Sequence, residues 1–232
     1  MHSPEPALAA ADREDAGTQP TLTVEVYFDF VCPWCLIGKR QLDAAASRLA
    51  QLRPDVRLHT VWHSYPLLPD VPPGGLPYQA FYVARLGSPE AVARRRAQVR
   101  QAGQAAGVPF AFDRIAVMPN TAAAHARVAQ AAAVGTEVQQ RQLIDRIFMA
   151  YFNGGRDIGD ASVLAQLARD CGLPAEAPVP GAERSQGRDP QAKVRHLVSG
   201  VPFFVFDASL ALAGAVSADT LLDAMLRALT PA

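Results

Sequence analysis

The sequence predicts an α/β fold in which a β-α-β unit near the start of the chain and a β-β-α unit near its end share one sheet. Three observations lead to this prediction. A β-branched and aromatic run at residues 21–30 precedes a segment of helical periodicity. A short apolar run at 201–206 precedes a second strand and a final helix. More than a hundred residues between these two parts show helical patterning, so we expect an inserted helical region.

The first unit begins with a strand at residues 21–30 (TLTVEVYFDF), in which apolar residues alternate with others. Pro33 then suits the first position of a helix, because that position has no use for a backbone N–H. Apolar residues recur at helical spacing as far as Pro54, which closes the helix. A second strand is predicted at 56–62 (VRLHTVW), which completes β-α-β.

The last unit begins with the nearly all-apolar run 201–206 (VPFFVF), which is typical of a buried central strand with its proline at the start. After a short turn, residues 210–213 form a second strand and make a hairpin with the first. Ser217 is the predicted cap of a final helix, with Asp219 in its first turn.

Start and stop signals divide the middle of the chain into helices. Ser88-Pro89-Glu90 is a cap, a first-turn proline and a first-turn acid. Helices are predicted at 121–134, 136–152 and 160–171, and 178–189 is predicted as a loop. The element order is that of a thioredoxin fold with an inserted all-helical domain. We expect a disordered leader at 1–20, the thioredoxin-fold domain at 21–74 and 196–232, and the helical domain at 75–195.

Charge and hydropathy exclude several partners. Lysine plus arginine and aspartate plus glutamate each number 22, which disfavours a nucleic-acid surface. The arginine run 94–96 is interpreted as a solvated helix face. No apolar stretch approaches the roughly 20 residues that span a bilayer, so no membrane partner is expected. The first 20 residues lack the features of a signal peptide, and we expect a cytoplasmic protein.

The chemistry of the chain centres on the motif Cys32-Pro33-Trp34-Cys35. Cys32 lies where a strand gives way to a helix, and the helix N-terminus favours a thiolate. Cys35 follows one helical turn later, so it can close a disulfide with Cys32 or resolve a mixed disulfide. Pro33 and Trp34 shape the site and set its redox poise. Cys171 falls in an apolar helical pattern and is interpreted as a core residue.

Other interpretations of the motif stay open. A Cys-x-x-Cys pair can be half of a zinc site, but no second such pair exists and the histidines show no paired spacing. Inert thiols are a further alternative. Asp29 and Glu25 are candidates for a proton relay to Cys35, although surface or capping positions are favoured for both. His63 is a candidate pocket residue, although an ordinary half-buried histidine is favoured.

Gly200-Val201-Pro202 opens the strand of the second unit. A cis bond before Pro202 would turn the backbone groups of Val201 outward, toward an extended substrate. An ordinary trans proline at the start of a strand is an equal alternative on this evidence.

Four blocks carry a family resemblance: FDFVCPWCLIGKR at 28–40, MPNTAAAHARVAQ at 118–130, AYFNGGRDIGD at 150–160 and VSGVPFFVFDASLALAGAVS at 198–217. They resemble the DsbA-like thioredoxin superfamily, closest to FrnE-type oxidoreductases and related to 2-hydroxychromene-2-carboxylate isomerases and kappa-class glutathione transferases. The resemblance spans about residues 22–230. It departs at 62–67, which lacks the expected Arg-Pro-Phe pattern, and at 175–190, where relatives continue a helix.

The resemblance implies roles for named residues. Cys32 matches the nucleophilic cysteine, Cys35 the resolving cysteine, and Pro202, after Val201, a cis-proline beside the disulfide. Asn120 matches an asparagine near the pocket of the isomerase branch, where a serine stands in place of Cys32. No tightly bound cofactor is implied beyond the Cys32–Cys35 disulfide, with glutathione as a candidate co-substrate.

Three functions therefore compete. The first is a thiol–disulfide oxidoreductase whose partners are disulfide- or dithiol-containing proteins or small thiols. The second is a glutathione-dependent isomerase or transferase acting on a small aromatic substrate. The third is a chaperone-like binding module, which large exposed apolar patches would favour. The intact cysteine pair favours the first.

Overall fold

A four-stranded sheet forms the centre of the protein in the computed structural model, which describes residues 19–175 and 198–230. Strand β1 (Thr21–Phe28) pairs in parallel with β2 (Arg57–Ser64) and antiparallel with β5 (Phe203–Phe206). β5 pairs in turn with β6 (Leu210–Ala213). The order is β2-β1-β5-β6, so the two central strands come from opposite ends of the chain.

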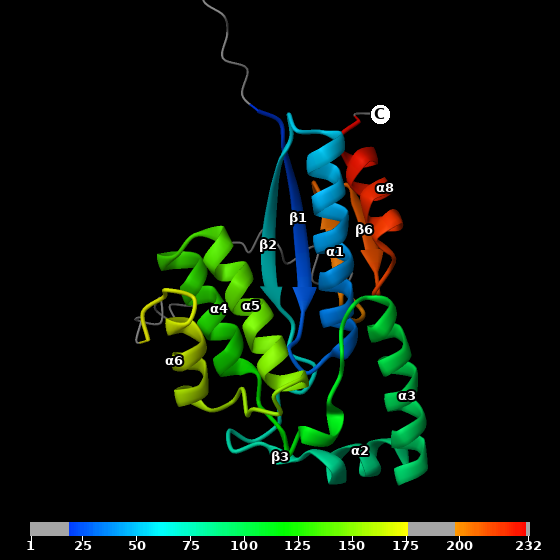
Figure 1. The fold of residues 1–232 in the computed structure, drawn as a ribbon, viewed down its shortest axis with the longest axis vertical. Coiled ribbons are helices and arrows are strands. Elements are labelled where there is room, and N and C mark those ends of the chain that lie inside the picture. Colours follow the sequence, from blue (N-terminus) through cyan, green and yellow to red (C-terminus); the bar gives the residue numbers. More distant parts are fainter. Residues whose placement is uncertain (1–18, 176–197, 231–232) are drawn as a thin grey trace, which may run out of the picture.

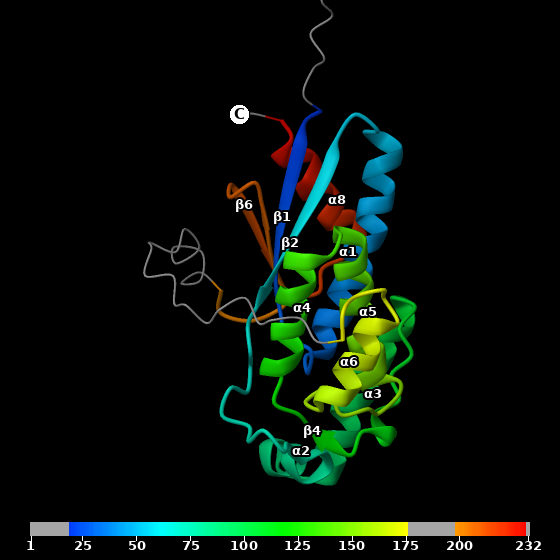
Figure 2. The same cartoon turned by 90° about the vertical axis from the view of Figure 1, so that its left-hand side faces the viewer.

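Helices α1 (Pro33–Leu52) and α8 (Ala218–Ala228) cover one face of the sheet (Figures 1 and 2). Alternate residues of β1 point toward them, since successive side chains of a strand face opposite ways. A continuous apolar core results; its fully buried members include Leu22, Val24, Leu49, Phe204, Leu221 and Met225. Tyr27, Phe203 and Val205 face the other side of the sheet and form a smaller cluster.

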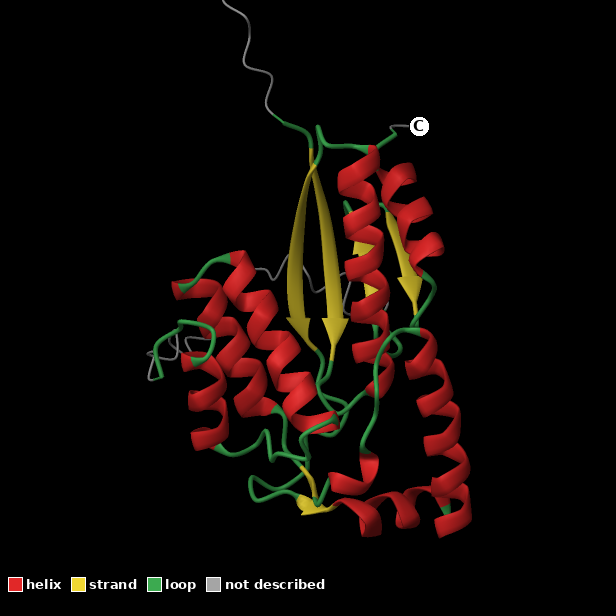
Figure 3. Cartoon of the chain, in the orientation of Figure 1, coloured by secondary structure: helices red, strands yellow, loops and turns green. Residues whose placement is uncertain are grey.

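Between β2 and β5 the chain forms a helical region, which lies at the end of the sheet where β1 stops and α1 starts (Figures 1 and 3). Its helices are α2 (Tyr78–Leu86), α3 (Pro89–Ala105), α4 (Ala122–Val134), α5 (Glu137–Phe152) and α6 (Ala161–Arg169). A short ribbon of β3 (Leu76–Pro77) and β4 (Val117–Met118) and the 3₁₀ turn η1 (Phe112–Arg114) complete it. The α/β thioredoxin-like fold with an inserted helical region is therefore confirmed.

Side-chain caps begin several helices, and those at Ser88 and Ser217 were predicted from the sequence. The Ser88 side chain accepts the N–H of Ala91, and Thr136 with Gln139 forms a reciprocal capping box. Asp160 and Ser217 likewise accept first-turn N–H groups of α6 and α8. These bonds satisfy donors that have no partner within the helix.

Several predicted boundaries were wrong. The first strand ends at Phe28, because the Asp29 carbonyl accepts the N–H of Cys32 in a turn. The run 201–206 becomes strand only from Phe203, and the helix at 160–171 ends at Arg169. α2 and the β3–β4 ribbon were not predicted. The predicted loop at 178–189 and most of the predicted leader lie outside the described residues, and the domain boundaries stay predictions.

A buried ion pair joins the sheet side of the molecule to the helical region. Lys39 of α1 is 1% exposed, and its Nζ lies 2.8 Å from Asp43 and 2.9 Å from Asp145 of α5. Two opposite charges compensate the cost of burying the ammonium group. Among the described residues, no helix is long and apolar enough to cross a bilayer.

Candidate active site at the start of α1

The cysteine pair lies at the N-terminus of α1, as predicted. Cys32 is the cap residue, with extended backbone (φ −90°, ψ 108°), and Pro33 is the first helical residue. The Cys35 N–H donates to the Cys32 carbonyl at 3.0 Å, which closes the first turn. Both thiols are free in the structure. The helix dipole therefore acts at Cys32, whose side chain accepts no hydrogen bond from the first-turn N–H groups.

The two thiols differ in their surroundings. Both are buried, Cys32 being 6% and Cys35 2% exposed, but Cys32 lines a pocket and Cys35 does not. Burial raises the pKa of Cys35 well above its usual value, and the neighbouring Cys32 raises it further. A hydrogen bond from the Asp29 backbone opposes this rise, and the Asp29 charge adds to it. Cys35 is therefore a neutral thiol near neutral pH, which suits the second step of an exchange rather than the first.

The chain that approaches β5 flanks Cys32. The Val201–Pro202 peptide bond is cis, and the Cys32 thiol donates to the Val201 carbonyl at an Sγ–O distance of 3.6 Å. Pro202 packs on α1 at Gly38, where an added Cβ would lie 2.9 Å from the proline Cγ. Only a glycine leaves this approach open without a shift of one element.

Asp29 is buried completely, so the interpretation of this residue as a surface or capping acid was wrong. Its Oδ2 accepts the N–H of Leu67 at 2.8 Å, and its Oδ1 lies 3.1 Å from Nε2 of His125 on α4. The His125 ring packs against Phe28 and Phe30, with centroids 5.1 and 5.0 Å away. A buried carboxylate thus lies one turn before the cysteine pair, held by the helical region.

The two other candidate pocket residues have different surroundings. His63 Nε2 lies 2.9 Å from Glu25 Oε2, and its ring stacks on Tyr27 with centroids 4.6 Å apart. Tyr27 belongs to the cluster on the sheet face away from α1, so His63 and Glu25 lie there too. Asn120 donates to the Val71 carbonyl at 2.6 Å and accepts the Ala122 N–H at 2.9 Å. It therefore holds the start of α4, and neither His63 nor Asn120 lines the pocket at Cys32.

Cys171 lies in the core of the helical region and is 7% exposed, as predicted. Burial raises the pKa of its thiol, which makes it a poor nucleophile. Within residues 19–175 and 198–230, no group of three or more His, Cys, Asp or Glu side chains is arranged to hold a metal ion.

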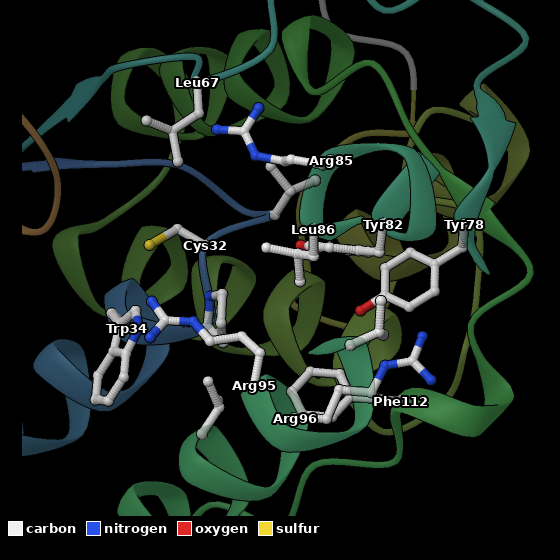
Figure 4. Close-up of a pocket in the computed structure, with 14 residues that line it drawn as sticks. Cys32, Trp34, Leu67, Tyr78, Tyr82, Arg85, Leu86, Arg95, Arg96 and Phe112 are labelled. Atoms are coloured by element: carbon white, nitrogen blue, oxygen red, sulfur yellow. The ribbon is translucent and has the colours of Figure 1, made fainter. Parts of the chain in front are cut away.

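The pocket at Cys32 was not foreseen from the sequence. Its volume is about 270 Å³, and the start of α1, the chain after β2, and helices α2 and α3 enclose it (Figure 4). The lining residues are Val31, Cys32, Pro33, Trp34, Leu67, Tyr78, Tyr82, Arg85, Leu86, Val92, Arg95, Arg96, Val99 and Phe112. The wall is mainly apolar and aromatic, with three arginines.

Part of the arginine run on α3 therefore belongs to the pocket. Arg95 lines it, and its guanidinium lies 5.8 Å from the ring centre of Trp34. The Arg96 side chain is only 15% exposed, so the interpretation of the whole run as a solvated face was wrong. Arg94 alone of the three is exposed and outside the pocket.

Comparison with known proteins gives a consistent result. A family model described as DSBA-like thioredoxin domain matches residues 23–226. The chain is 26% identical over 155 residues to the uncharacterized protein YwbO of Bacillus subtilis (strain 168), which covers 66% of this chain and 68% of that one. It is similar to the structure of a probable DsbA oxidoreductase from Streptomyces coelicolor, with a TM-score of 0.74, 25% identity, and 91% and 92% of the two chains covered. It shares its fold with the cytosolic disulfide reductase DsbM of Pseudomonas aeruginosa, solved with GSH, at a TM-score of 0.58 and 19% identity, with 89% and 95% covered.

Proposed function

Since the chain belongs to the family of DSBA-like thioredoxin domains, we propose that it is a thiol–disulfide oxidoreductase of the FrnE type, cycling a Cys32–Cys35 disulfide. One observation carries the proposal. A cysteine at the first turn of α1 lines a pocket, and its partner one turn later is buried with a raised pKa. This asymmetry suits an attacking thiol and a resolving thiol.

The reaction follows from that arrangement. The Cys32 thiolate attacks one sulfur of a substrate disulfide, forms a mixed disulfide and releases the other sulfur as a thiolate. Cys35 then loses its proton and attacks Cys32, which frees the second substrate thiol and leaves the Cys32–Cys35 disulfide. Two electrons pass from the cysteine pair to the substrate. The same steps in reverse oxidise a dithiol.

Asp29 is the proposed acceptor of the Cys35 proton. The Asp29 backbone donates a hydrogen bond to the Cys35 sulfur, and the Asp29 charge makes a small contribution to the raised pKa of that thiol. His125 and the Leu67 N–H hold the carboxylate in place. A base that accepts the Cys35 proton lowers the barrier that burial of this thiol puts before the second step.

The proposed partners are disulfide- or dithiol-containing proteins or small thiols in the cytoplasm, with glutathione as a co-substrate. The GSH in the DsbM structure supports glutathione for a protein of this fold. A second candidate function, a glutathione-dependent isomerase or transferase on a small aromatic compound, is favoured by the apolar pocket beside Cys32. It has no use for the second cysteine, and for that reason we rank it lower.

A redox titration tests the proposal. The protein is equilibrated in glutathione buffers of graded potential, quenched with an alkylating agent and weighed by mass spectrometry. Wild type and Cys171→Ser should show one two-electron transition between dithiol and disulfide, and Cys35→Ser should accumulate a mixed disulfide with glutathione instead. If no Cys32–Cys35 disulfide forms at any potential while the protein stays folded, the proposed function is wrong.

A further inference from the structure

The pocket at Cys32 combines an apolar wall with unpaired positive charge. Tyr78, Tyr82 and Phe112 supply rings, and Leu86, Val92 and Val99 supply aliphatic surface. Burial raises the pKa of both tyrosines above its usual value, so both phenols are neutral and can donate a hydrogen bond. Such a wall favours an uncharged, ring-sized part of a ligand.

The three arginines of the pocket fall into two kinds. Arg96 is held by its own neighbours: its guanidinium lies 5.1 Å from the ring centre of Tyr78, and it donates to Gln79 at 2.8 Å. Asp113 also lies 3.6 Å from it. Arg96 is thus part of the wall.

Arg85 and Arg95 are exposed, and no carboxylate of the described residues lies within ion-pair distance of either. Figure 4 shows both guanidinium groups on the Cys32 side of the pocket, one on each side of the cysteine. The Arg95 guanidinium makes a cation–π contact with Trp34, 5.8 Å from the centre of the ring. Each of these guanidinium groups can bind a carboxylate through paired hydrogen bonds.

Size limits the occupant. A cavity of about 150 Å³ holds benzene, and this pocket measures about 270 Å³. A substituted ring or a body of similar size therefore fits in the pocket next to Cys32.

We propose that the pocket selects low-molecular-weight disulfides that carry an apolar, ring-sized body and a carboxylate, with Arg85 and Arg95 as the residues that recognise the carboxylate. This inference rests on the proposed function, because it names the substrate class of the same cysteine pair. Cys32 attacks the sulfur attached to the body, the other half leaves as a thiolate, and Cys35 releases the first half. A small thiol or dithiol returns the cysteine pair to the reduced state.

The test measures how fast the reduced, full-length protein reacts with three disulfides in a stopped-flow instrument. 5,5′-Dithiobis(2-nitrobenzoate) has a ring and a carboxylate, 2,2′-dithiodipyridine has a ring without charge, and oxidised glutathione has carboxylates without a ring. Each rate constant is divided by the rate constant for the reaction of 2-mercaptoethanol with the same disulfide, so that differences in intrinsic reactivity among the three disulfides cancel. The variants are Arg85→Gln, Arg95→Gln and Arg95→Lys, and Arg94→Gln is the matched control on α3.

The normalised rate should be highest for the nitrobenzoate disulfide. Arg85→Gln and Arg95→Gln should each lower it about two- to fivefold, as expected for one exposed charge pair, and the neutral disulfide should change less than twofold. Arg95→Lys should restore most of the loss, added salt should shrink the difference, and Arg94→Gln should behave as wild type. Equal losses for the charged and neutral disulfides, or an equal effect of Arg94→Gln, would overturn the inference. A folded wild type that reacts with none of the three overturns the proposed function instead.

Discussion

Replacing Asp29 by alanine tests the buried carboxylate that connects the cysteine motif to the helical region. In the native protein its two oxygens contact the Leu67 N–H at 2.8 Å and His125 Nε2 at 3.1 Å. Each buried polar group that loses its partner costs about 1–3 kcal/mol, so two cost about 2–6 kcal/mol. We therefore expect Asp29→Ala to lower the free energy of unfolding by about 2–6 kcal/mol.

Urea denaturation of the reduced protein, followed by tryptophan fluorescence, measures this change. Asp29→Asn keeps an acceptor for the Leu67 N–H, so its loss should be smaller. A double-mutant cycle with His125→Ala should give a coupling of about 1–3 kcal/mol, because the two side chains share one contact. Asp223→Ala on the exposed face of α8 is the control, with an expected change of about 0–1 kcal/mol. A loss below about 1 kcal/mol for Asp29→Ala, or full additivity with His125→Ala, would refute the reasoning.

Four further predictions concern the cysteines and their support. Cys32→Ser should abolish disulfide reduction in an insulin assay, whereas Cys171→Ser, a core change, should retain it; a loss of activity in folded Cys171→Ser would contradict this. Iodoacetamide at neutral pH should alkylate Cys32 before Cys35, which is 2% exposed with a raised pKa, and peptide masses would reveal the opposite order. The pKa of Cys35 is raised above the ordinary thiol value of 9.0, so its neutral thiol stabilises the reduced fold at any pH below 9.0, and this stabilisation is lost as the pH rises above 9.0. Wild type should therefore lose stability above pH 9.0 relative to Cys35→Ala. Stability curves that stay parallel over this range would contradict the prediction. Gly38→Ala places a Cβ 2.9 Å from Pro202. The cost of overpacking, about 1–3 kcal/mol, should outweigh the gain in helix propensity of about 1 kcal/mol, so the variant should be less stable than wild type. A more stable and equally active variant would refute that contact.

The features predicted correctly from the sequence depend on neighbours along the chain. Pro33 at the first position of α1 and the caps at Ser88 and Ser217 each follow from residues within one helical turn. The same holds for the cysteine pair, whose placement needs only the strand before it and the helix that it begins. Local patterns of this kind survive folding because tertiary contacts do not have to create them.

The features that were missed depend on distant contacts. Asp29 is buried by partners 38 and 96 positions away, and no local pattern marks that burial. α2 begins after Pro77 with no capping side chain, so no start signal in the sequence marks it. Because α2 was missed, the wall that faces Arg95 was missed with it, and the arginine run was taken for solvent-facing charge. The β3–β4 ribbon has two residues in each strand, too few for any alternation.

The pairing of strands from opposite ends of the chain has a consequence for synthesis. Cys32 and the Val201 carbonyl that it contacts are 169 positions apart. A ribosome that adds about 5–20 residues per second needs roughly 10–30 s to make the intervening chain. Throughout that interval β1 can pair only with β2, and the Cys32 thiol lacks the carbonyl that it contacts in the finished fold. The residues that line the pocket, which end at Phe112, are made well before this partner, so the pocket wall precedes the last contact of the reactive thiol in synthesis.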